Sequence, residues 1–537
     1  MTDIEIPLER RTAQYRFFEI LPGFVSISVI VALFVFSVFA PFAAAIFILF
    51  FVMVMFVKAA AFAFRTIQGY LVFRKTTKIN WAKRLDDLTD PVKSLGQRFN
   101  KREYGMAQHR LNLRQVSRAS GEFPKPNDII HAVFVFIYKE NFDIVGPTID
   151  AVLASNYDPK KMILVLAYEA RGGKNAKETV DQVLKNYKGK FSDILTYRHP
   201  ANLPDEVIGK GPNATYAGRE FAKYVKKQGI SPEDVIVTTL DADNRVDPNF
   251  FPYLTYEWIV TPNRQRVSFQ PICVFANNIW DVPAPMRVVA TGNSFWNIIS
   301  SMRPHLLRNF ASHAQGLSAL IGMDFWSKRT IVEDGHQYWR SYFYFDGDYS
   351  VIPLRIAIGQ DAVLSDTYVK TLKAQFVQVR RWAYGASDIA YVAKNIFRKG
   401  RTVPFFRAFT RLWRLLDSHI TQAVIAPMIA FGAWIPILVN PEASSILYIQ
   451  NLQPTIGLIQ TVAMFGLFTT MFTSFAMLPE RPKRYKKGRG LLMALQWVLM
   501  PVTSILYVSS SAYYAQIRLL IGKYMEKFDT TEKFVKK

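Results

Sequence analysis

At 537 residues, half of them hydrophobic and 42 of them Phe, the chain is long enough for more than one folding unit and unusually apolar for a soluble protein. Its single cysteine, Cys273, excludes an internal disulfide and a zinc site built from cysteines. The formal net charge of +24 suits either nucleic acid or basic loops at the cytoplasmic face of a membrane, so the positions of the basic residues decide between the two.

The N-terminal region, residues 1–64, is dominated by an apolar stretch. No charged residue occurs from Ile20 to Val57, and after Lys58 the apolar character continues to Phe64. A membrane-spanning helix needs roughly 20 apolar residues, so the stretch predicts two spans joined by a tight turn near Pro41. It is too long for the apolar part of a cleavable signal peptide. A buried hairpin of a soluble protein is disfavoured, because soluble helices carry a polar face and these do not.

Residues 65–128 form a basic linker. Its Lys and Arg residues include Arg74, Lys75, Lys78, Lys83, Arg84, Lys93, Arg98, Lys101, Arg102 and Arg110. Basic residues beside a span are typical of the cytoplasmic side, which places the linker and the N-terminus there. The linker accounts for much of the net charge, and the sequence contains no recognisable helix-turn-helix, zinc-finger or aromatic stacking motif. We therefore expect no nucleic-acid partner.

From residue 129 the pattern changes to alternating strand-like and helix-like runs. The strand-like runs are Ala132–Tyr138, Met162–Tyr168, Ile194–Arg198 and Val235–Leu240. The helix-like runs between them are Ile144–Ala154, Lys177–Tyr187 and Tyr216–Lys227. This βαβ order predicts a mostly parallel sheet in an α/β domain, which we place at residues 129–400. A dinucleotide-binding fold and a P-loop NTPase both lack their glycine-rich fingerprints here.

The C-terminal region returns to membrane patterns. Residues 401–417 have apolar and Arg positions at helical spacing, which indicates an amphipathic helix in the membrane interface. Residues 418–522 begin with two uncharged stretches, Ile420–Asn440 and Ala443–Pro479, which predict two spans joined by a short outside loop near Glu442.

The last apolar stretch, Leu491–Ile517, follows a strongly basic loop at residues 481–489 and is interrupted by Pro501. A complete crossing would place the basic tail, residues 523–537, outside the cell, against the positive-inside tendency. The sequence leaves open whether this stretch crosses the membrane or bends back at Pro501. The whole pattern predicts a multi-pass integral protein of the plasma membrane whose α/β domain lies in the cytosol.

The strand-like run that begins at Val235 ends in two carboxylates, Asp241 and Asp243. Ligands bind outside the carboxyl ends of strands in open α/β sheets, and residues i and i+2 of an extended segment point to one side. Two carboxylates that share a site repel each other unless a cation lies between them. We therefore expect Asp241 and Asp243 to hold Mg²⁺ or Mn²⁺ together with a phosphate group. The alternative for an isolated Asp-x-Asp is a turn in which Asp241 caps the following segment.

Four more residues occupy related positions. Tyr138 ends the first strand-like run and Glu140 follows it, and Glu169 follows the second run, where a nucleotide would lie. Lys210 belongs to a basic loop, Gly209–Asn213, that is suited to meet phosphate. Each of these signals alone is weak, because a glutamate at a strand end is more often a solvated turn residue.

Two further motifs complete a recognisable set. Val332-Glu-Asp334 and Gln378-Val-Arg-Arg-Trp382 follow Asp241-Ala-Asp243 in chain order, between two groups of predicted spans. In this order and setting, the three motifs resemble those of the membrane-embedded family 2 glycosyltransferases, the group that includes cellulose, hyaluronan and chitin synthases. The resemblance covers roughly residues 129–400.

The resemblance implies a GT-A-like fold and an inverting hexosyltransferase that takes a UDP- or GDP-sugar as donor. The residues implied to bind the donor, its diphosphate and the metal ion are Tyr138, Glu140, Glu169, Lys210, Asp241 and Asp243. Those implied to line the acceptor and diphosphate site are Gln378, Arg381 and Trp382, and Asp334 is implied to be the general base. These roles are chemically consistent, because inversion needs a proton acceptor at one end and a stabilised leaving diphosphate at the other.

Structural alternatives exist for the same residues. Trp382 would also fit an interfacial belt, since a predicted span follows it. Glu333 and Asp334 would also fit the acidic first turn of a helix. A lone histidine such as His336 is expected to be structural.

The chain departs from the family pattern in three places. Val332 stands where the family has Thr, and the family's Phe-Phe-Cys-Gly stretch has no clear match, Ser312–Gly316 lying nearby instead. The family's Phe-x-Val-Thr-x-Lys motif does not follow Trp382, but Phe528–Lys533 closes the chain in a similar form, with Thr530 for Val. Processivity and the identity of the acceptor are therefore left open.

Three functions are compatible with these observations. The leading hypothesis is extension of a glycan at the cytoplasmic membrane face. Whether the polymer also passes outward between the helices is left open. The nearest alternative is transfer of a single sugar to a lipid-linked acceptor. The distant alternative, a transporter with a degenerate regulatory domain, is disfavoured because the predicted spans lack the paired charges that ion pathways usually need.

Overall fold

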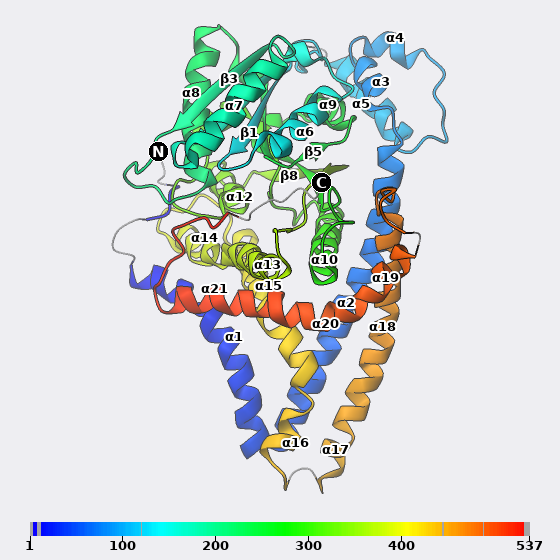
Figure 1. Ribbon diagram of the computed structural model, residues 1–537, viewed down its shortest axis with the longest axis vertical. Coiled ribbons are helices and arrows are strands. Elements are labelled where there is room, and N and C mark those ends of the chain that lie inside the picture. The colour runs from blue at the N-terminus through cyan, green and yellow to red at the C-terminus, as the bar shows by residue number, and fades with distance from the viewer. Residues whose placement is uncertain (1–3, 8–11, 120, 443–444, 487, 531–537) are drawn as a thin grey trace.

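The computed structural model describes residues 4–7, 12–119, 121–442, 445–486 and 488–530. An α/β domain sits above a group of long helices (Figure 1). The N-terminal helices are α1 (Ala13–Phe39) and α2 (Pro41–Thr77), and they are separated at Ala40. Pro41 explains the break, because proline fits the first turn of a helix but cannot continue the preceding one.

Helix α2 does not end near residue 64. It continues through the first part of the basic linker to Thr77, and three short or medium helices follow it: α3 (Trp81–Asp86), α4 (Pro91–Leu95) and α5 (Met106–Arg118). The linker is thus folded against the α/β domain, with Trp81 stacked on Tyr253 at a ring-centroid distance of 3.7 Å.

The first half of the sheet is parallel, as the βαβ pattern predicts. Strands β1 (Ile130–Ile137), β2 (Met162–Glu169), β3 (Asp193–His199) and β4 (Val235–Asp241) pair in the order β3-β2-β1-β4. Every pairing among these four strands is parallel. Their carboxyl ends therefore share one edge, the edge at which Asp241 lies.

The second half of the sheet is mixed. Strands β7 (Ala314–Gly316), β6 (Val267–Val274), β8 (Ser350–Gly359) and β5 (Arg245–Val246) extend it beyond β4 in that order. Strand β7 is antiparallel to both neighbours, whereas β6 and β8 are parallel to each other. The α/β prediction with a mostly parallel sheet is confirmed.

Helices cover both faces of the sheet, which explains why its central strands are continuous apolar runs rather than alternating ones. Val133 and Val135 of β1 pack into one core with α6 (Phe142–Leu153), α7 (Gly173–Tyr187) and α9 (Phe250–Val260). Ala132 and Phe134 point the other way, into a core with α8 (Lys210–Lys227) and α11 (Leu317–Gly322).

The remaining helices connect this domain to the lower part of the molecule. They are α10 (Ala284–Ser301), α12 (Glu333–Tyr344), α13 (Tyr368–Ala383), α14 (Asp388–Phe397), α15 (Phe405–Phe431), α16 (Ile435–Val439), α17 (Leu447–Gln450) and α18 (Leu452–Ala476). The predicted interfacial helix and the start of the predicted span after it form one continuous helix, α15. Helix α18 packs along α2.

The final helical run is α19 (Arg489–Leu495), α20 (Met500–Thr503) and α21 (Ser510–Leu520), joined by a 3₁₀ turn at Gln496–Leu499 and a π-helical turn at Ser504–Ser509. In Figure 1 this run lies across the long helices, at the level where the α/β domain meets them.

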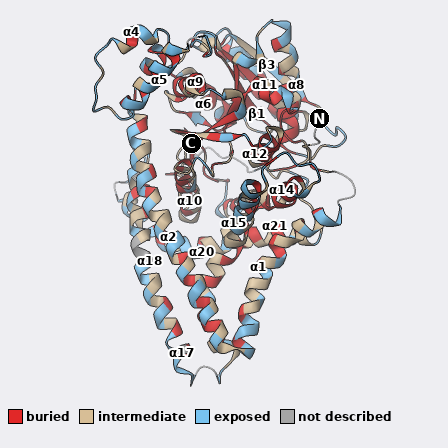
Figure 2. Cartoon of the chain, turned by 180° about the vertical axis from the view of Figure 1, so that it is seen from behind, coloured by how far each residue is buried: buried red, intermediate tan, exposed pale blue. Residues whose placement is uncertain are grey.

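Among the described residues, three helical segments are long and apolar enough to cross a membrane: α1, α2 and the run Arg489–Leu520. The long helices below the α/β domain expose large apolar side chains such as Phe39, Phe50 and Phe64, in contrast to the buried interior of the domain (Figure 2). Exposed apolar surface of this kind is typical of helices that contact lipid.

Candidate functional site

One large cavity joins the sheet edge to the long helices. Its volume is about 1890 Å³, and its walls come from the carboxyl ends of β1, β2 and β4, from α8, α10, α12 and α13, and from α2, α15 and α18 below. All ten residues that the sequence singled out line it: Tyr138, Glu140, Glu169, Lys210, Asp241, Asp243, Asp334, Gln378, Arg381 and Trp382. The fold therefore brings together side chains that are up to 244 positions apart in the chain, from Tyr138 to Trp382.

Lys210 lies among three acidic side chains in this cavity. Its Nζ lies 2.8 Å from Oδ1 of Asp241, 3.0 Å from Oδ2 of Asp334 and 4.0 Å from Oε1 of Glu333. Burial alone would lower the pKa of Lys210, but Asp241, then Asp334 and Glu333, overcome that effect and hold its pKa above the ordinary value. Lys210 is therefore a permanent cation at neutral pH.

The position of Lys210 depends on its neighbour Gly211 at the start of α8. A Cβ at Gly211 would collide with the carbonyl oxygen of Ser327 and press on the side chain of Glu333. Only glycine allows the first turn of α8 to approach the Ser327 loop and the start of α12 this closely. A lysine at a helix N-terminus opposes the helix dipole, so its carboxylate partners are what stabilise it there.

Glu333 and Asp334 are the first two residues of α12, where acidic side chains favour the helix dipole. Burial, together with the adjacent charge of Asp334, raises the pKa of Glu333 to about 8. Glu333 is thus neutral over most of the physiological range, and Asp334 is the exposed member of the pair, with 19% of its side chain accessible. Nδ1 of the buried His313 lies 3.8 Å from Oδ1 of Asp334, and burial lowers the pKa of His313.

The Asp241–Asp243 turn is fixed by side-chain hydrogen bonds. Oδ1 of Asn244 accepts from the backbone N–H of Asp241 at 2.8 Å and from the hydroxyl of Ser312 at 2.6 Å. Oδ2 of Asp243 accepts from the backbone N–H of Asp361 at 3.0 Å. Asp241 and Asp243 both line the cavity, Asp241 facing Lys210.

These two carboxylates fit a divalent cation that is bound together with a diphosphate. In the part of the chain that the structure describes, no group of three or more His, Cys, Asp or Glu residues could hold a metal on its own. Mg²⁺ and Mn²⁺ at phosphate sites commonly take only one or two protein carboxylates, because phosphate oxygens and waters supply the other ligands. The donor set at Asp241 and Asp243 meets that requirement.

The carboxyl ends of β1 and β2 form another wall of the cavity, which includes Tyr138, Glu140 and Glu169. Oε2 of Glu140 accepts the backbone N–H groups of Tyr138 at 2.7 Å and Lys139 at 3.1 Å, so this carboxylate folds back onto its own turn. Glu169 is buried at the end of β2, and its Oε2 accepts from Nη2 of Arg171 at 2.6 Å. The same oxygen lies 3.2 Å from Nδ1 of His199.

Sequence reasoning missed His199 and Arg171, which hold Glu169 in place. His199 is the last residue of β3, and its Nε2 lies 3.0 Å from Oε2 of Glu206. Burial would lower the pKa of His199, but its hydrogen bonds with Glu169 and Glu206 raise it to about 9. The strand-end position of His199 could have identified it, because His199 ends a parallel strand just as Glu169 and Asp241 do.

Helix α13 supplies three of the lining residues, Gln378, Arg381 and Trp382. The guanidinium carbon of Arg381 lies 3.8 Å from the centroid of the Phe528 ring, and its Nη1 donates to the carbonyl of Asp529 at 2.9 Å. Trp382 packs near Phe275, at a ring-centroid distance of 6.0 Å, and faces the cavity rather than an outer surface. Oε1 of Gln378 accepts from Gln375 at 3.2 Å.

The C-terminal segment closes one side of the site instead of forming a free tail. The N–H of Ile208 donates to the carbonyl of Glu526 at 2.9 Å, and the N–H of Phe528 donates back to Ile208 at 2.6 Å. Asp529 forms an ion pair with Arg380, and Phe528 and Thr530 line the cavity. The rest of the Phe528–Lys533 motif lies outside the described residues.

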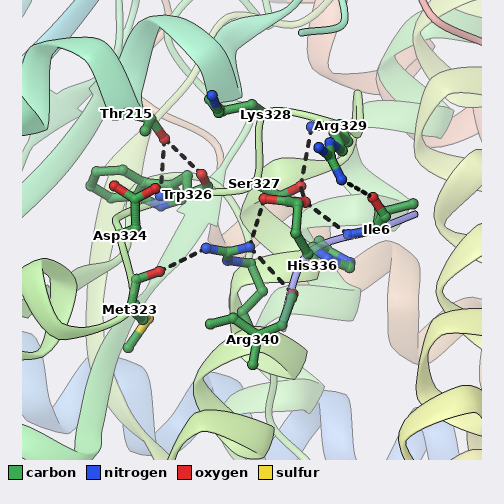
Figure 3. A network of polar contacts seen from close by, with 12 residues as sticks. Ile6, Thr215, Met323, Asp324, Trp326, Ser327, Lys328, Arg329, His336 and Arg340 are labelled. Carbon is green, nitrogen blue, oxygen red and sulfur yellow. Dashed lines mark hydrogen bonds and ion pairs between the residues drawn. The ribbon is translucent and has the colours of Figure 1, made fainter. Parts of the chain in front are cut away.

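A network behind α12 anchors the helix that carries Asp334 (Figure 3). Arg340 of α12 donates to the carbonyl of Met323 at 2.8 Å and to Oε2 of Glu5 at 2.8 Å, and Glu5 also accepts from Ser327. Arg329 donates to the carbonyl of Ile6 at 2.8 Å. The N-terminal segment thus ties the Ser327 loop to α12.

His336, one turn into α12, is buried, and its Nδ1 lies 2.7 Å from Oδ1 of Asp388. Its ring also packs on Tyr391 at a centroid distance of 4.4 Å. These contacts join α12 to α14 and agree with a structural role.

Known proteins offer distant likenesses to this chain. No family model matches it, and no curated protein matches it. Among solved structures it is similar to the mannosyltransferase PcManGT from Pyrobaculum calidifontis in complex with GDP-Man and Mn²⁺, at 14% identity and a TM-score of 0.39, over 77% of this chain and 99% of that one. It is also similar to S. aureus TarS 1–349 in complex with UDP-GlcNAc, at 11% identity and a TM-score of 0.35, over 66% and 93%.

A third likeness is to GalNAc-T7 with UDP, GalNAc and Mn²⁺, at 13% identity and a TM-score of 0.32, over 54% of this chain and 58% of that one. At these TM-scores the likenesses carry no functional argument, so the proposals below rest on the side chains of this chain.

Proposed function

We propose that the chain is an inverting hexosyltransferase that moves a sugar from a UDP- or GDP-sugar to a growing glycan at the cytoplasmic face of a membrane. The observation that carries the proposal is the bridge that Lys210 makes between Asp241, at a strand end, and Asp334, at the start of α12. This bridge supports the proposal because it brings a strand-end carboxylate suited to a metal-bound diphosphate close to a candidate base, next to the aromatic and basic side chains of α13.

In the proposed reaction, Asp334 accepts the proton of an acceptor hydroxyl. The hydroxyl oxygen forms a bond to the anomeric carbon of the donor sugar while the bond from that carbon to the diphosphate oxygen breaks, and the nucleoside diphosphate leaves. Asp334 is suited to this task because it is the accessible carboxylate of its pair. Trp382 offers a flat apolar face to the acceptor sugar.

The leaving diphosphate gains negative charge, and Lys210 and Arg381 are the basic groups placed to stabilise it. Asp241 and Asp243 would hold Mg²⁺ or Mn²⁺, which neutralises further charge on the leaving group when bound. Because a bound diphosphate competes with Asp334 for Lys210, donor binding would free Asp334 for its proton. Tyr138 and Glu169 would contact the base and ribose, and Arg171 and His199 orient Glu169 through their contacts with its Oε2.

Membrane placement is also part of the proposal. Helices α1, α2, α18 and the lower half of α15 would cross the plasma membrane, with the α/β domain in the cytosol. The cavity supports this arrangement, because it runs from the sheet edge to apolar residues of α2, α15 and α18. An acceptor could therefore reach Asp334 from the level of the bilayer.

The decisive test replaces the proposed base. Purified full-length protein would be incubated with a panel of UDP- and GDP-sugars and Mn²⁺ or Mg²⁺, and release of nucleoside diphosphate would be measured. A general base contributes about 10²- to 10⁴-fold, so Asp334→Asn should lower turnover by about 10²-fold or more. Asp348→Asn, at an exposed carboxylate paired with Arg266, should leave turnover unchanged.

Two further readouts sharpen this test. EDTA should abolish the release and added Mn²⁺ or Mg²⁺ should restore it. The length of the glycan formed by a membrane preparation separates extension from single-sugar transfer. Unchanged turnover in Asp334→Asn would contradict the proposed mechanism.

A further inference from the structure

Five arginines line the membrane-facing half of the same cavity, and the mechanism above uses none of them. They are Arg65 of α2, Arg303 and Arg308 after α10, and Arg411 and Arg414 of α15. They come from three separate parts of the chain, so the fold rather than a local sequence run gathers them.

These cations are poorly neutralised within the protein. Among the described residues, the side chains of Arg65, Arg303 and Arg414 have no hydrogen bond or ion pair, and Nε of Arg303 is buried without a partner. The nearby carboxylate of Asp417 is already paired with Lys58, at 3.1 Å. Burial lowers the pKa of Arg303, and the charges of Arg65 and Arg414 lower it further. Gathered like charges are costly unless an anion joins them.

Two of the arginines connect this cluster to the helix that carries Asp334. Arg411 donates to the hydroxyl of Tyr338 and lies 4.8 Å from the centroid of the Tyr342 ring. Arg308 lies 5.8 Å from the ring of Trp339. Tyr338 follows Asp334 by four residues on α12, on the same helix face and about 6 Å along the axis. An anion at the arginines would therefore lie within a short glycan's reach of the proposed base.

Beyond the arginines the cavity walls become apolar. Val52, Met55 and Phe56 of α2 face Ile425 and Ile429 of α15 and Ile459 of α18. A free phosphate or a soluble sugar phosphate would leave these walls unused, whereas an alkyl chain would fill them. An arginine that merely extends to the lipid headgroups would be exposed, whereas Arg65, Arg303, Arg308 and Arg411 are half-buried. Arg414 is exposed, and it lines the same cavity that contains Asp334.

We propose that the cavity binds the phosphate or diphosphate ester of a long apolar chain. The anion would lie among Arg303, Arg411 and Arg414, and the chain would lie between α2, α15 and α18. A hydroxyl of the carried sugar would then lie at Asp334. This inference rests on the proposed function and names its acceptor class: a glycan attached to a lipid through phosphate.

The test measures binding of a lipid phosphate directly. Purified full-length protein in a neutral detergent would be incubated with ³²P-labelled hexadecyl phosphate, and retained label would be measured against unlabelled competitors. Each lost guanidinium contact to an ionised phosphate is expected to lower affinity by about tenfold, so the Arg303→Gln/Arg414→Gln double variant should bind at least about tenfold more weakly. Arg407→Gln, at an exposed arginine of α15 outside the cavity lining, should bind as the wild type does.

The competitors identify the ligand class. Unlabelled hexadecyl phosphate should displace the label, whereas hexadecanol and inorganic phosphate at the same concentration should not. Displacement by inorganic phosphate alone would mean a free phosphate site. Stronger displacement by an oligomer of glucuronic acid would mean an acidic glycan. Equal binding by the wild type and the double variant would mean that the arginines hold no phosphate. Each of these three results would overturn the inference.

Binding is measured without a donor, which separates this inference from the proposed function. Asp334→Asn should still bind hexadecyl phosphate, because Asp334 does not belong to the arginine cluster. If the wild type turns over sugar nucleotides but does not retain hexadecyl phosphate, this inference is wrong and the proposed function stands. If it retains the lipid but releases no nucleoside diphosphate from any donor, the proposed function fails instead.

Discussion

At the scale of single residues, opposite charges organise the largely buried centre around Lys210 and Glu333. Lys210 contacts both Asp241 and Asp334, and Glu333 beside them is driven to its neutral form. A charged group in such a place must be paired or change its protonation. Lys210 is charged and paired, whereas Glu333 changes its protonation.

The protonation of Glu333 makes a prediction about pH and stability. With a pKa of about 8 in the folded protein, against an ordinary value of 4.5, folded Glu333 holds a proton that the unfolded chain has lost. Its contribution to stability is therefore full below about pH 4.5 and is lost as pH rises through 8. The slope is no steeper than about 1.4 kcal/mol per pH unit.

Glu333→Gln keeps the shape of the neutral side chain and removes this titration. We expect the melting temperature of the variant to rise relative to the wild type between pH 5 and pH 8, as measured by thermal unfolding in detergent. Glu178→Gln, at an exposed glutamate of α7, should show a difference that does not change with pH. A flat difference for Glu333→Gln would mean that Glu333 is ionised in the folded protein.

The sequence pointed to ten of the residues that line the cavity through strand ends, ordered motifs and, for Lys210, a basic loop suited to phosphate. It did not locate His313 or His199. Strand β7, which follows directly after His313, has only three residues and no apolar run. The sequence therefore does not predict this strand or a site residue beside it. His199 ends a strand whose residues are mostly half-exposed, so its apolar pattern is weak, although the strand-end rule would have included it.

At the scale of secondary-structure elements, α12 carries the proposed base, Asp334, in its first turn. The N-terminal segment holds it from behind through Glu5 and Arg340, whose side chains are only 20% and 3% exposed. Local sequence could not reveal this contact, since the two residues are 335 positions apart. The four parallel strands, by contrast, coincide with local apolar runs of the sequence, so they could be predicted from it.

Glu5→Gln is expected to weaken this anchor. Loss of a partly buried charge pair should cost about 1–3 kcal/mol of stability, and turnover of the donor should fall several-fold while the KM for the donor changes little. The KM is spared because Glu5 acts on α12 and not on the strand ends that we propose to bind the donor. Thermal unfolding and nucleoside diphosphate release would measure the two effects.

Asp348→Asn is a matched control for Glu5→Gln, since it removes a pair with Arg266 in which both side chains are more than half exposed. A double-mutant cycle with Arg340→Gln should give a coupling energy of about 1 kcal/mol or more. Strictly additive effects would mean that the N-terminal segment does not position α12.

At the scale of the whole molecule, the open question from the sequence concerns the run Arg489–Leu520, which is long and apolar enough to cross a membrane. Its two ends contact the same α/β domain. Before the run, Arg484 pairs with Asp281 at 2.7 Å. After it, Glu526 and Phe528 form backbone hydrogen bonds with Ile208. Composition could not distinguish a crossing helix from one that lies flat, because the distinction depends on these long-range contacts.

We therefore expect the run to lie in the cytoplasmic interface without crossing. Single cysteines would be introduced by Glu442→Cys, Lys486→Cys and Lys523→Cys and labelled on intact cells with a membrane-impermeant maleimide; the native Cys273 is buried. The Glu442 position should be labelled from outside, and the two lysine positions only after permeabilisation. This result follows because a tail outside the cell could not form the backbone hydrogen bonds that join Glu526 and Phe528 to Ile208, two residues before Lys210. Labelling at Lys523 on intact cells would mean that the run crosses the membrane and that the C-terminal segment does not close the site.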